Sequence, residues 1–395
     1  MKLKFILVLL LFATSSMFAQ NNDSLLITNN SATRLLNSNN KFTIGGYAQI
    51  DYNQPFGNEK FNNGTLDVHR LVMLLGYNFN KRVKFISEIE YEHVKEVYVE
   101  QAFLQYKLNN FLNIRAGLML IPMGLINEYH EPPVFNGVER PLSDKYIAPT
   151  TWRELGIGIS GNIIGASLKY QAYVVNGFNG YDSNGGTFNG KNGLRKGRQK
   201  GAESYINTPN YTAKVEYYGL RGLNIGVSGY FGESQSTLYN GISKDNNNEL
   251  LTADSSIVEI SMIGFDTRYN FKGIQLKGQL YYTSISNSDQ YNKFTANDLG
   301  SSMLGYYIEA GYNVFRPFSS INSELIPFIR YEAYNTHYSV ENNIPKNDSY
   351  NNENITIGIG WKITPKVVVK SDLQIFNSKD GSSINAFNAG VGLMF

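Results

Sequence analysis

Apolar and polar residues alternate with a period of two along most of the chain, a pattern that predicts β-strands. In residues 274–280, for example, Ile274, Leu276 and Leu280 share one face, and polar side chains share the other. From Lys41 onward this alternation forms sixteen segments of about ten residues each. The predicted strands are 41–53, 65–79, 82–92, 97–108, 111–121, 153–160, 165–175, 210–218, 223–232, 257–271, 274–286, 304–315, 323–334, 353–363, 366–376 and 385–395.

The connections between these strands distinguish a membrane barrel from a soluble sandwich, because both folds produce the same alternation. Short connections are 80–81, 109–110, 161–164, 219–222, 272–273, 316–322 and 364–365, and long ones are 54–64, 122–152, 176–209, 233–256, 287–303, 335–352 and 377–384. The two sets alternate along the chain, except near 93–96. We therefore predict an all-β fold: a transmembrane antiparallel up-and-down β-barrel with long extracellular loops and short periplasmic turns.

The first nineteen residues have the features of a secretory signal peptide. Lys2 and Lys4 precede the apolar run 5–12, and Ala19 precedes the expected cleavage point. The alternative, a membrane anchor, is disfavoured because about eight apolar residues are too few to span a bilayer as a helix. Without these residues the chain has equal numbers of basic and acidic residues, which removes the electrostatic argument for nucleic-acid binding.

The rest of the chain divides into a lead and a barrel. Residues 20–40 are polar and predict a flexible periplasmic lead with a short helical turn around Ser31–Leu36, and residues 41–395 form the barrel. The last segment alternates and ends on Phe395. A C-terminal strand that ends in Phe resembles the signal that outer-membrane proteins present to the barrel-insertion machinery.

Composition removes several classes of site. The chain has no Cys, four His and 17% charged residues. Disulfide scaffolds, Cys-based metal sites and thiol nucleophiles are therefore excluded, and four His leave little material for a histidine metal cluster. No G-x-S-x-G motif occurs. We expect no enzyme activity, no cofactor and no metal.

If the apolar face of each strand meets lipid, the polar face lines a lumen. The pore-lining candidates are Arg70, Arg82, Lys84, Glu88, Glu90, Arg115, Lys169, Lys214, Arg268, Lys277, Glu309, Arg330 and Glu332. Acidic and basic members nearly balance, so we expect many to pair across strands. A lumen with this many charges is expected to hold water, because unpaired charges in a dry core are costly.

Two loops carry further candidate residues. The loop 122–152 is stiffened by prolines and is predicted to fold into the lumen as a constriction; the alternative is a surface loop on the rim. Its candidate residues are Glu128, His130, Glu131, Glu139, Arg140, Asp144 and Lys145. The loop 176–209 carries the basic run Lys191, Arg195, Lys196, Arg198 and Lys200. This run is predicted to attract anions or to bridge lipopolysaccharide, and a solvated loop is the alternative.

The densest motifs lie between residues 97 and 180. They are Val99–Tyr106, Asn113–Gly117, Ile121–Gly124, Val138–Pro141, Trp152–Ile157 and Asn176–Gly180. Together they resemble porins of the phosphate-selective O and P type, in the branch common in Bacteroidetes outer membranes. The resemblance implies a sixteen-stranded barrel, usually a homotrimer, that passes small hydrophilic solutes. The arginine ladder of the phosphate-selective members has no clear equivalent here.

We therefore expect an outer-membrane porin for passive diffusion of small hydrophilic solutes and ions, with anions such as phosphate as candidates. Its expected surroundings are outer-membrane lipid and lipopolysaccharide. Two alternatives remain at this stage: a loop-plugged barrel that acts as a surface-binding or scaffold protein, and a secreted soluble β protein that binds a ligand.

Overall fold

The computed structural model describes residues 30–57, 62–243, 245–341 and 344–395. The predicted signal peptide and the first part of the predicted lead lie outside the described residues. None of the described helices is long and apolar enough to cross a bilayer.

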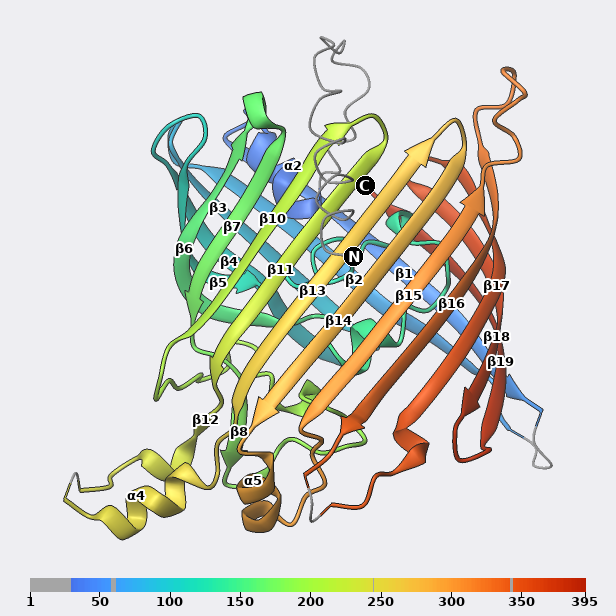
Figure 1. Cartoon of the computed structure of the whole chain (residues 1–395). Coiled ribbons are helices and arrows are strands. Elements are labelled where there is room, and N and C mark those ends of the chain that lie inside the picture. Colours follow the sequence, from blue (N-terminus) through green and yellow to red (C-terminus); the bar gives the residue numbers. More distant parts are fainter. Residues whose placement is uncertain (1–29, 58–61, 244, 342–343) are drawn as a thin grey trace, which may run out of the picture.

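Sixteen strands of the described chain close into one antiparallel barrel (Figure 1), in which each strand pairs with its neighbours in sequence and β1 pairs with β19. They are β1 (Phe42–Phe56), β2 (Thr65–Asn78), β3 (Val83–Glu92), β4 (Glu96–Lys107), β5 (Asn113–Leu120), β6 (Arg153–Ile163), β7 (Leu168–Val175), β10 (Asn210–Leu220), β11 (Leu223–Glu233), β13 (Glu259–Phe271), β14 (Ile274–Ser286), β15 (Ser302–Tyr312), β16 (Glu324–Ser339), β17 (Asn351–Thr364), β18 (Val367–Ser378) and β19 (Ser383–Met394). Closure leaves no unpaired edge in this sheet. The predicted fold class is confirmed.

All sixteen predicted strands are present, and their boundaries differ from the prediction by a few residues. The largest difference lies at the end of β16, which extends to Ser339, and the adjoining β17 also begins earlier than predicted, at Asn351. Polar residues of both strands pair there, Asn335 opposite Asn351. Alternation of apolar and polar residues fades in this Asn-rich stretch, so the sequence pattern ended the strands too early.

Short elements outside the barrel lie in the connections. The helices are α2 (Ser31–Asn37), α3 (Ser143–Tyr146), α4 (Asn247–Asp254) and α5 (Ser288–Thr295), and the 3-10 turns are η2 (Pro132–Val134), η3 (Ile164–Ala166), η4 (Arg195–Gly197), η5 (Thr237–Tyr239) and η6 (Asp348–Tyr350). The strands β8 (Asn179–Asp182), β9 (Gly185–Gly186) and β12 (Gln235–Ser236) form a small separate sheet.

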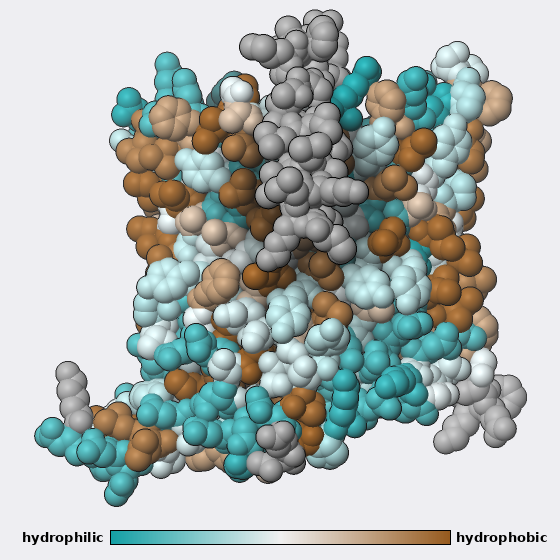
Figure 2. Space-filling view, viewed as in Figure 1, coloured by the Kyte–Doolittle hydropathy of each residue, from teal (hydrophilic) through white to brown (hydrophobic). Residues whose placement is uncertain are grey.

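The two faces of the barrel wall differ as the alternation predicts. On β14, Leu276 and Leu280 are exposed on the outer face, whereas Gln279 and Tyr281 on the inner face are buried. Figure 2 shows hydrophobic residues over the strand wall and hydrophilic residues gathered at the end that carries α4 and α5. An apolar belt of this extent suits the hydrocarbon of a bilayer.

The two ends of the barrel carry different connections. The long-loop end holds the connections 121–152, 176–209 and 234–258, and the short-turn end holds two-residue turns such as 221–222. The length alternation is looser than predicted, because the connection 313–323 at the short-turn end is as long as the connection 340–350 at the long-loop end.

Helix α2 lies inside the barrel near its short-turn end (Figure 1). Ala32, Leu35 and Leu36 are buried, and the helix contacts β2 and β3. The predicted helical turn is thus present, but residues 30–37 are not the flexible lead that was predicted. Their apolar side chains gain more by packing on the apolar patch around Ile86 than by remaining in water.

Candidate functional site in the barrel lumen

The connection between β5 and β6, residues 121–152, crosses the lumen, and we call it the inner loop. Its backbone reaches distant parts of the wall: the Leu125 amide donates to Gln279 on β14 at 3.0 Å, and the Val138 amide donates to Asp372 on β18 at 2.6 Å. Most of its side chains are buried. The loop therefore lies in the lumen and not on the rim.

Small residues of the wall allow the inner loop to pack closely. A Cβ atom at Gly392 on β19 would lie 2.3 Å from the Cβ of Pro132, and one at Gly305 on β15 would lie 2.6 Å from Ile147 Cγ1. Both distances are shorter than atoms tolerate, so a larger side chain at either position would displace the loop.

Aromatic rings fix the end of the inner loop. Trp152 is buried and stacks on Phe178 of the following loop with ring centroids 4.3 Å apart, and Tyr230 of β11 lies 4.6 Å away. The Trp152 backbone amide donates to Asn127 Oδ1 at 2.9 Å, which ties the two ends of the loop together.

The structure pairs many of the predicted pore-lining charges with one another or with other inward-facing carboxylates. The ion pairs are Arg70–Glu90 (3.6 Å), Lys169–Glu216 (2.9 Å), Lys214–Asp266 (3.4 Å), Arg268–Glu216 (2.8 Å), Lys277–Glu309 (3.3 Å), Arg330–Glu309 (3.4 Å) and Arg330–Glu332 (3.5 Å). The inner loop adds Glu128, 3.2 Å from Lys214. At the height of these ion pairs the inner loop fills the lumen. The charges are therefore balanced by protein partners, whereas a water-filled lumen was expected.

Four predicted pore-lining residues form none of these ion pairs. Arg82 is exposed in the turn before β3, at the short-turn mouth. Lys84 donates to the Leu36 carbonyl of α2 at 2.6 Å, and Arg115 donates to Gln105 at 2.8 Å. Glu88 accepts from Gln101 at 2.6 Å and belongs to the cluster around His130 described below.

The seven predicted constriction residues separate into two groups. Glu128, His130, Glu131 and Asp144 are buried and hold the loop in place: Glu131, for example, accepts from the Ser31 amide of α2 at 2.6 Å. Glu139, Arg140 and Lys145 keep some exposure. Of the seven, these three keep exposed surface, although Nε and Nη2 of Arg140 are buried.

His130 lies at the contact between the inner loop and three strands. Its Nε2 atom is 3.2 Å from Glu100 Oε2 and 2.9 Å from the Tyr47 hydroxyl oxygen, and 3.7 Å from Glu88 Oε1. Burial opposes a charge on the ring, but the carboxylates of Glu100 and Glu88 outweigh it and hold the pKa of His130 well above its usual range.

The basic run of residues 176–209 is folded over the long-loop mouth. Lys191 and Lys196 are exposed, whereas Arg195, Arg198 and Lys200 are partly buried. Arg198 Nη1 donates to Thr151 Oγ1 at 2.7 Å, which attaches the run to the inner loop. Burial and the like charge of Arg195 lower the pKa of Arg198. The segment is therefore not a free solvated loop.

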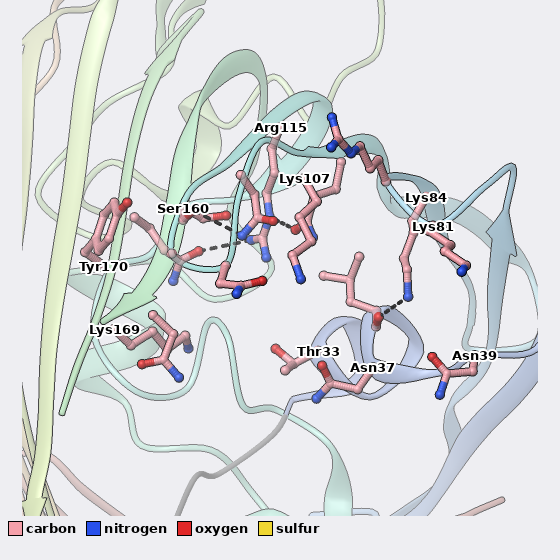
Figure 3. Close-up of a pocket in the computed structure, with 18 residues that line it drawn as sticks. Thr33, Asn37, Asn39, Lys81, Lys84, Lys107, Arg115, Ser160, Lys169 and Tyr170 are labelled. Carbon is pink, nitrogen blue, oxygen red and sulfur yellow. Dashed lines mark hydrogen bonds between the residues drawn. The ribbon is translucent and has the colours of Figure 1, made fainter. Parts of the chain in front are cut away.

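A cavity of about 500 Å³ opens beside α2 at the short-turn end, and we call it the basic chamber. Its wall carries six cations and no acidic residue: Lys81, Arg82, Lys84, Lys107, Arg115 and Lys169. Figure 3 shows Lys84, Lys107 and Arg115 from the wall and Asn37 from the helix around the same space. Among the described residues, no carboxylate lies within salt-bridge distance of any of these cations except Lys169. This chamber has the composition that attracts anions.

A smaller cavity of about 270 Å³ is lined by Arg34 on the other face of α2, with Arg268, Lys277 and Lys362. It also lacks acidic lining residues, although these three wall cations are paired with carboxylates. Helix α2 thus contributes to both cavities at the short-turn mouth.

Sequence reasoning missed several of these residues. Lys107, Lys81 and Glu100 were not singled out. Lys107 shares the inward-facing positions of β4 with Phe103 and Gln105, so the period-two pattern could have identified it. Glu100 lies at a β-bulge, where Glu88 pairs with Gln101 and Ile89 pairs with Val99, and this interruption of the alternation turns it inward without a period-two signal. No sequence signal indicated that α2 would complete the chamber.

The chain is 31% identical over 364 residues to an uncharacterised protein of Aquifex aeolicus strain VF5, covering 89% of this chain and 80% of that protein. The chain belongs to the family of this protein. No model of a known protein family matches the chain.

Solved structures resemble the barrel at low sequence identity and show the fold alone. The anion-selective porin from Comamonas acidovorans has a TM-score of 0.56 and 13% identity, covering 90% of this chain and 99% of that chain. The outer membrane channel DcaP of Acinetobacter baumannii has a TM-score of 0.56 and 12% identity, with 90% and 97% covered. OmpF of Salmonella typhi in complex with daunomycin has a TM-score of 0.56 and 14% identity, with 90% and 98% covered.

Proposed function

We propose that this chain is a bacterial outer-membrane channel for passive diffusion of small hydrophilic solutes, with a preference for anions. The basic chamber is the main observation that supports this proposal. It is a cavity of about 500 Å³ inside a closed barrel, and six cations and no acidic residue line it. A barrel that served only as a packed scaffold would not be expected to keep a cavity lined by unpaired charges, because such charges are costly away from water. The barrel neighbours named above are channels and porins of outer membranes, which supports the same conclusion.

For a barrel in the outer membrane, we expect the long-loop end to face outward and the short-turn end to face the periplasm. Arg195, Arg198 and Lys200 then gather anions at the outer mouth, and the basic chamber receives them at the inner mouth. Between them the inner loop narrows the lumen, with Glu139 and Lys145 as its more accessible charges. The resemblance to phosphate-selective porins agrees with this direction of selectivity, and phosphate is the anion to test first.

The test is planar-bilayer recording of the refolded chain in a tenfold KCl gradient, followed by addition of phosphate. Stable steps with an anion-selective reversal potential are expected, and phosphate is expected to lower the chloride current. Lys81→Gln/Lys107→Gln should move the reversal potential toward zero, while Lys293→Gln, an exposed cation of α5 outside the lumen, should not. Cation-selective or unselective steps would contradict the anion preference.

A second candidate follows from one observation: α2 and the inner loop together bury much of the lumen wall. A barrel that stays closed in this way would serve as a surface-binding or scaffold protein. Deletion of residues 132–146 distinguishes the channel from the closed barrel. A channel that the inner loop constricts conducts when intact and should conduct more after the deletion. An intact chain that never conducts, and conducts only after the deletion, would favour the closed barrel.

We further propose that three copies assemble in the membrane, as the resemblance implies and as one neighbour, OmpT of Vibrio cholerae, has a trimer form. Lipid, lipopolysaccharide and the barrel-insertion machinery are the proposed surroundings. Native mass measurement in detergent tests the assembly: a mass of three chains is expected, and a single-chain mass at all detergent concentrations would contradict it.

A further inference from the structure

One buried charged cluster of the inner loop has a composition that neither solute passage nor loop packing requires. It joins His130 of the loop to Glu88 on β3, Glu100 on β4 and Tyr47 on β1, and each of these side chains is almost fully buried. We propose that His130, Glu88 and Glu100 bind a divalent transition-metal ion, Zn²⁺ by preference, which fastens the inner loop to the barrel wall.

The spacing of the ligand atoms fits a tetrahedral ion. Zinc bonds to nitrogen and oxygen ligands are about 2.0–2.2 Å long, so neighbouring ligand atoms lie about 3.3–3.6 Å apart. His130 Nε2 is 3.2 Å from Glu100 Oε2 and 3.7 Å from Glu88 Oε1, and all three ligand atoms lie within 4.8 Å of one another. Binding therefore requires only small side-chain movements.

The Tyr47 hydroxyl lies where a fourth ligand would be. Its oxygen is 3.0 Å from Glu88 Oε1 and 2.9 Å from His130 Nε2. With the two carboxylates and the imidazole it completes a set of four nitrogen and oxygen atoms. Such a set suits zinc. The fourth ligand would be either the phenol oxygen of Tyr47 or a water molecule that this oxygen binds.

Groups around the cluster orient its ligands as they do in metal sites. His130 Nδ1 lies 3.0 Å from the Asn127 carbonyl oxygen, and an Nδ1–H that donates there turns Nε2 toward the carboxylates. Gln101 Nε2 donates to Glu88 Oε2 at 2.6 Å, which leaves Oε1 of the same carboxylate facing His130. Gln101 is thus a positioning residue.

Glu100 supplies an independent indication of a missing partner. Its side chain is 0% exposed, and among the described residues neither oxygen accepts a hydrogen bond of good geometry; it forms an ion pair with His130, and the charges of Arg153 and Arg70 act on it from further away. A buried carboxylate without donors is costly. A dication that displaces the Nε2 proton of His130 into solvent would satisfy it, and its two charges would then match the two carboxylates beside a neutral imidazole.

The full chain, refolded with and without Zn²⁺ and then dialysed, is the material for the test. A second group, Asp67, His69 and His93, is partly exposed and would also take up metal. All measurements are therefore made in a His69→Asn/His93→Asn background. Calorimetry with Zn²⁺ measures stoichiometry and affinity, and Co²⁺ in place of Zn²⁺ reports tetrahedral geometry through its visible absorption.

One ion per chain and a tetrahedral Co²⁺ spectrum are expected. His130→Gln should abolish both, and Gln101→Met should lower the affinity about 10- to 100-fold. Gln105→Met, a matched change on the inner face of the same strand whose amide bonds Arg115, should leave the affinity unchanged. If His130→Gln fails to fold, Glu100→Gln replaces it.

Absence of binding in the His69→Asn/His93→Asn background would overturn the proposal, as would binding that His130→Gln and Glu100→Gln leave unchanged. Because the measurement is made in detergent and needs no current, its outcome does not depend on whether the barrel conducts.

Discussion

Lys214 connects the inner loop to the wall, and its removal offers the clearest measure of how firmly the loop is held. Its Nζ atom lies 3.2 Å from Glu128 Oε2 on the loop, 3.4 Å from Asp266 Oδ2 on β13 and 2.6 Å from the Gly124 carbonyl oxygen. The side chain is 1% exposed. Lys214→Met keeps the length of the side chain and removes the charge, which leaves two buried carboxylates without their common cation.

Breaking a buried ion pair by removing one partner costs about 3–5 kcal/mol, because the other charge stays in a medium of low dielectric. We expect Lys214→Met to lower the free energy of unfolding by this amount. The matched control is Lys293→Met, since Lys293 lies 2.6 Å from Asp289 but is 60% exposed. Loss of that pair should cost less than about 1 kcal/mol.

The assay is equilibrium unfolding in urea of the chain refolded into lipid vesicles, followed by tryptophan fluorescence. Trp152 in the stacked end of the inner loop reports on the loop, and Trp361 on the outer face of β17 reports on the wall. A Trp361→Phe background separates the two signals. Equal losses for Lys214→Met and Lys293→Met, both below about 1 kcal/mol, would refute the view that buried pairs hold the loop.

Three further predictions concern the loop and α2. Gly392→Ala places a Cβ atom 2.3 Å from Pro132 and should lower the free energy of unfolding, measured in urea, by about 1–3 kcal/mol. The control is Gly360→Ala, whose Cβ atom would have its nearest neighbour at 4.0 Å and which should leave this free energy nearly unchanged. Equal effects of the two variants would contradict close packing of the loop. Asp144 lies on the inner loop, outside the spanning strands, and burial raises its pKa to about 8. The folded chain thus binds a proton there that the unfolded chain releases above about pH 4, so stability falls as pH rises from about 4 to 8; Asp144→Asn should reduce this fall in urea midpoints, and an unchanged pH profile would refute the assignment. Leu35→Asp should release α2 from the wall and raise single-channel conductance, while Leu35→Met, which keeps an apolar side chain at the same position, should not; a conductance unchanged by Leu35→Asp would show that α2 does not obstruct the mouth.

The barrel itself followed from local patterns in the sequence. Strand β14 illustrates why: the apolar Ile274, Leu276 and Leu280 alternate with the polar Gln275, Lys277 and Gln279, and a period of two places them on opposite faces wherever the strand lies. The same pattern identified Lys214, Arg330 and Glu309 as inward-facing. Where the pattern was weak, as in the Asn-rich end of β16, the strand boundary was wrong by several residues.

What the chain cannot encode locally is which inward-facing residues meet across the lumen. Glu88, Glu100 and His130 come from two strands and a loop, and Lys84 meets the Leu36 carbonyl of a helix 48 positions away in sequence. Alternation determines the face of each side chain, and so the sequence alone determined the wall, its two faces and its charge-bearing lining. Only the closed tertiary structure decided that the inner loop and α2 enter the lumen, because burial of their apolar residues and pairing of their charges depend on all sides of the barrel at once.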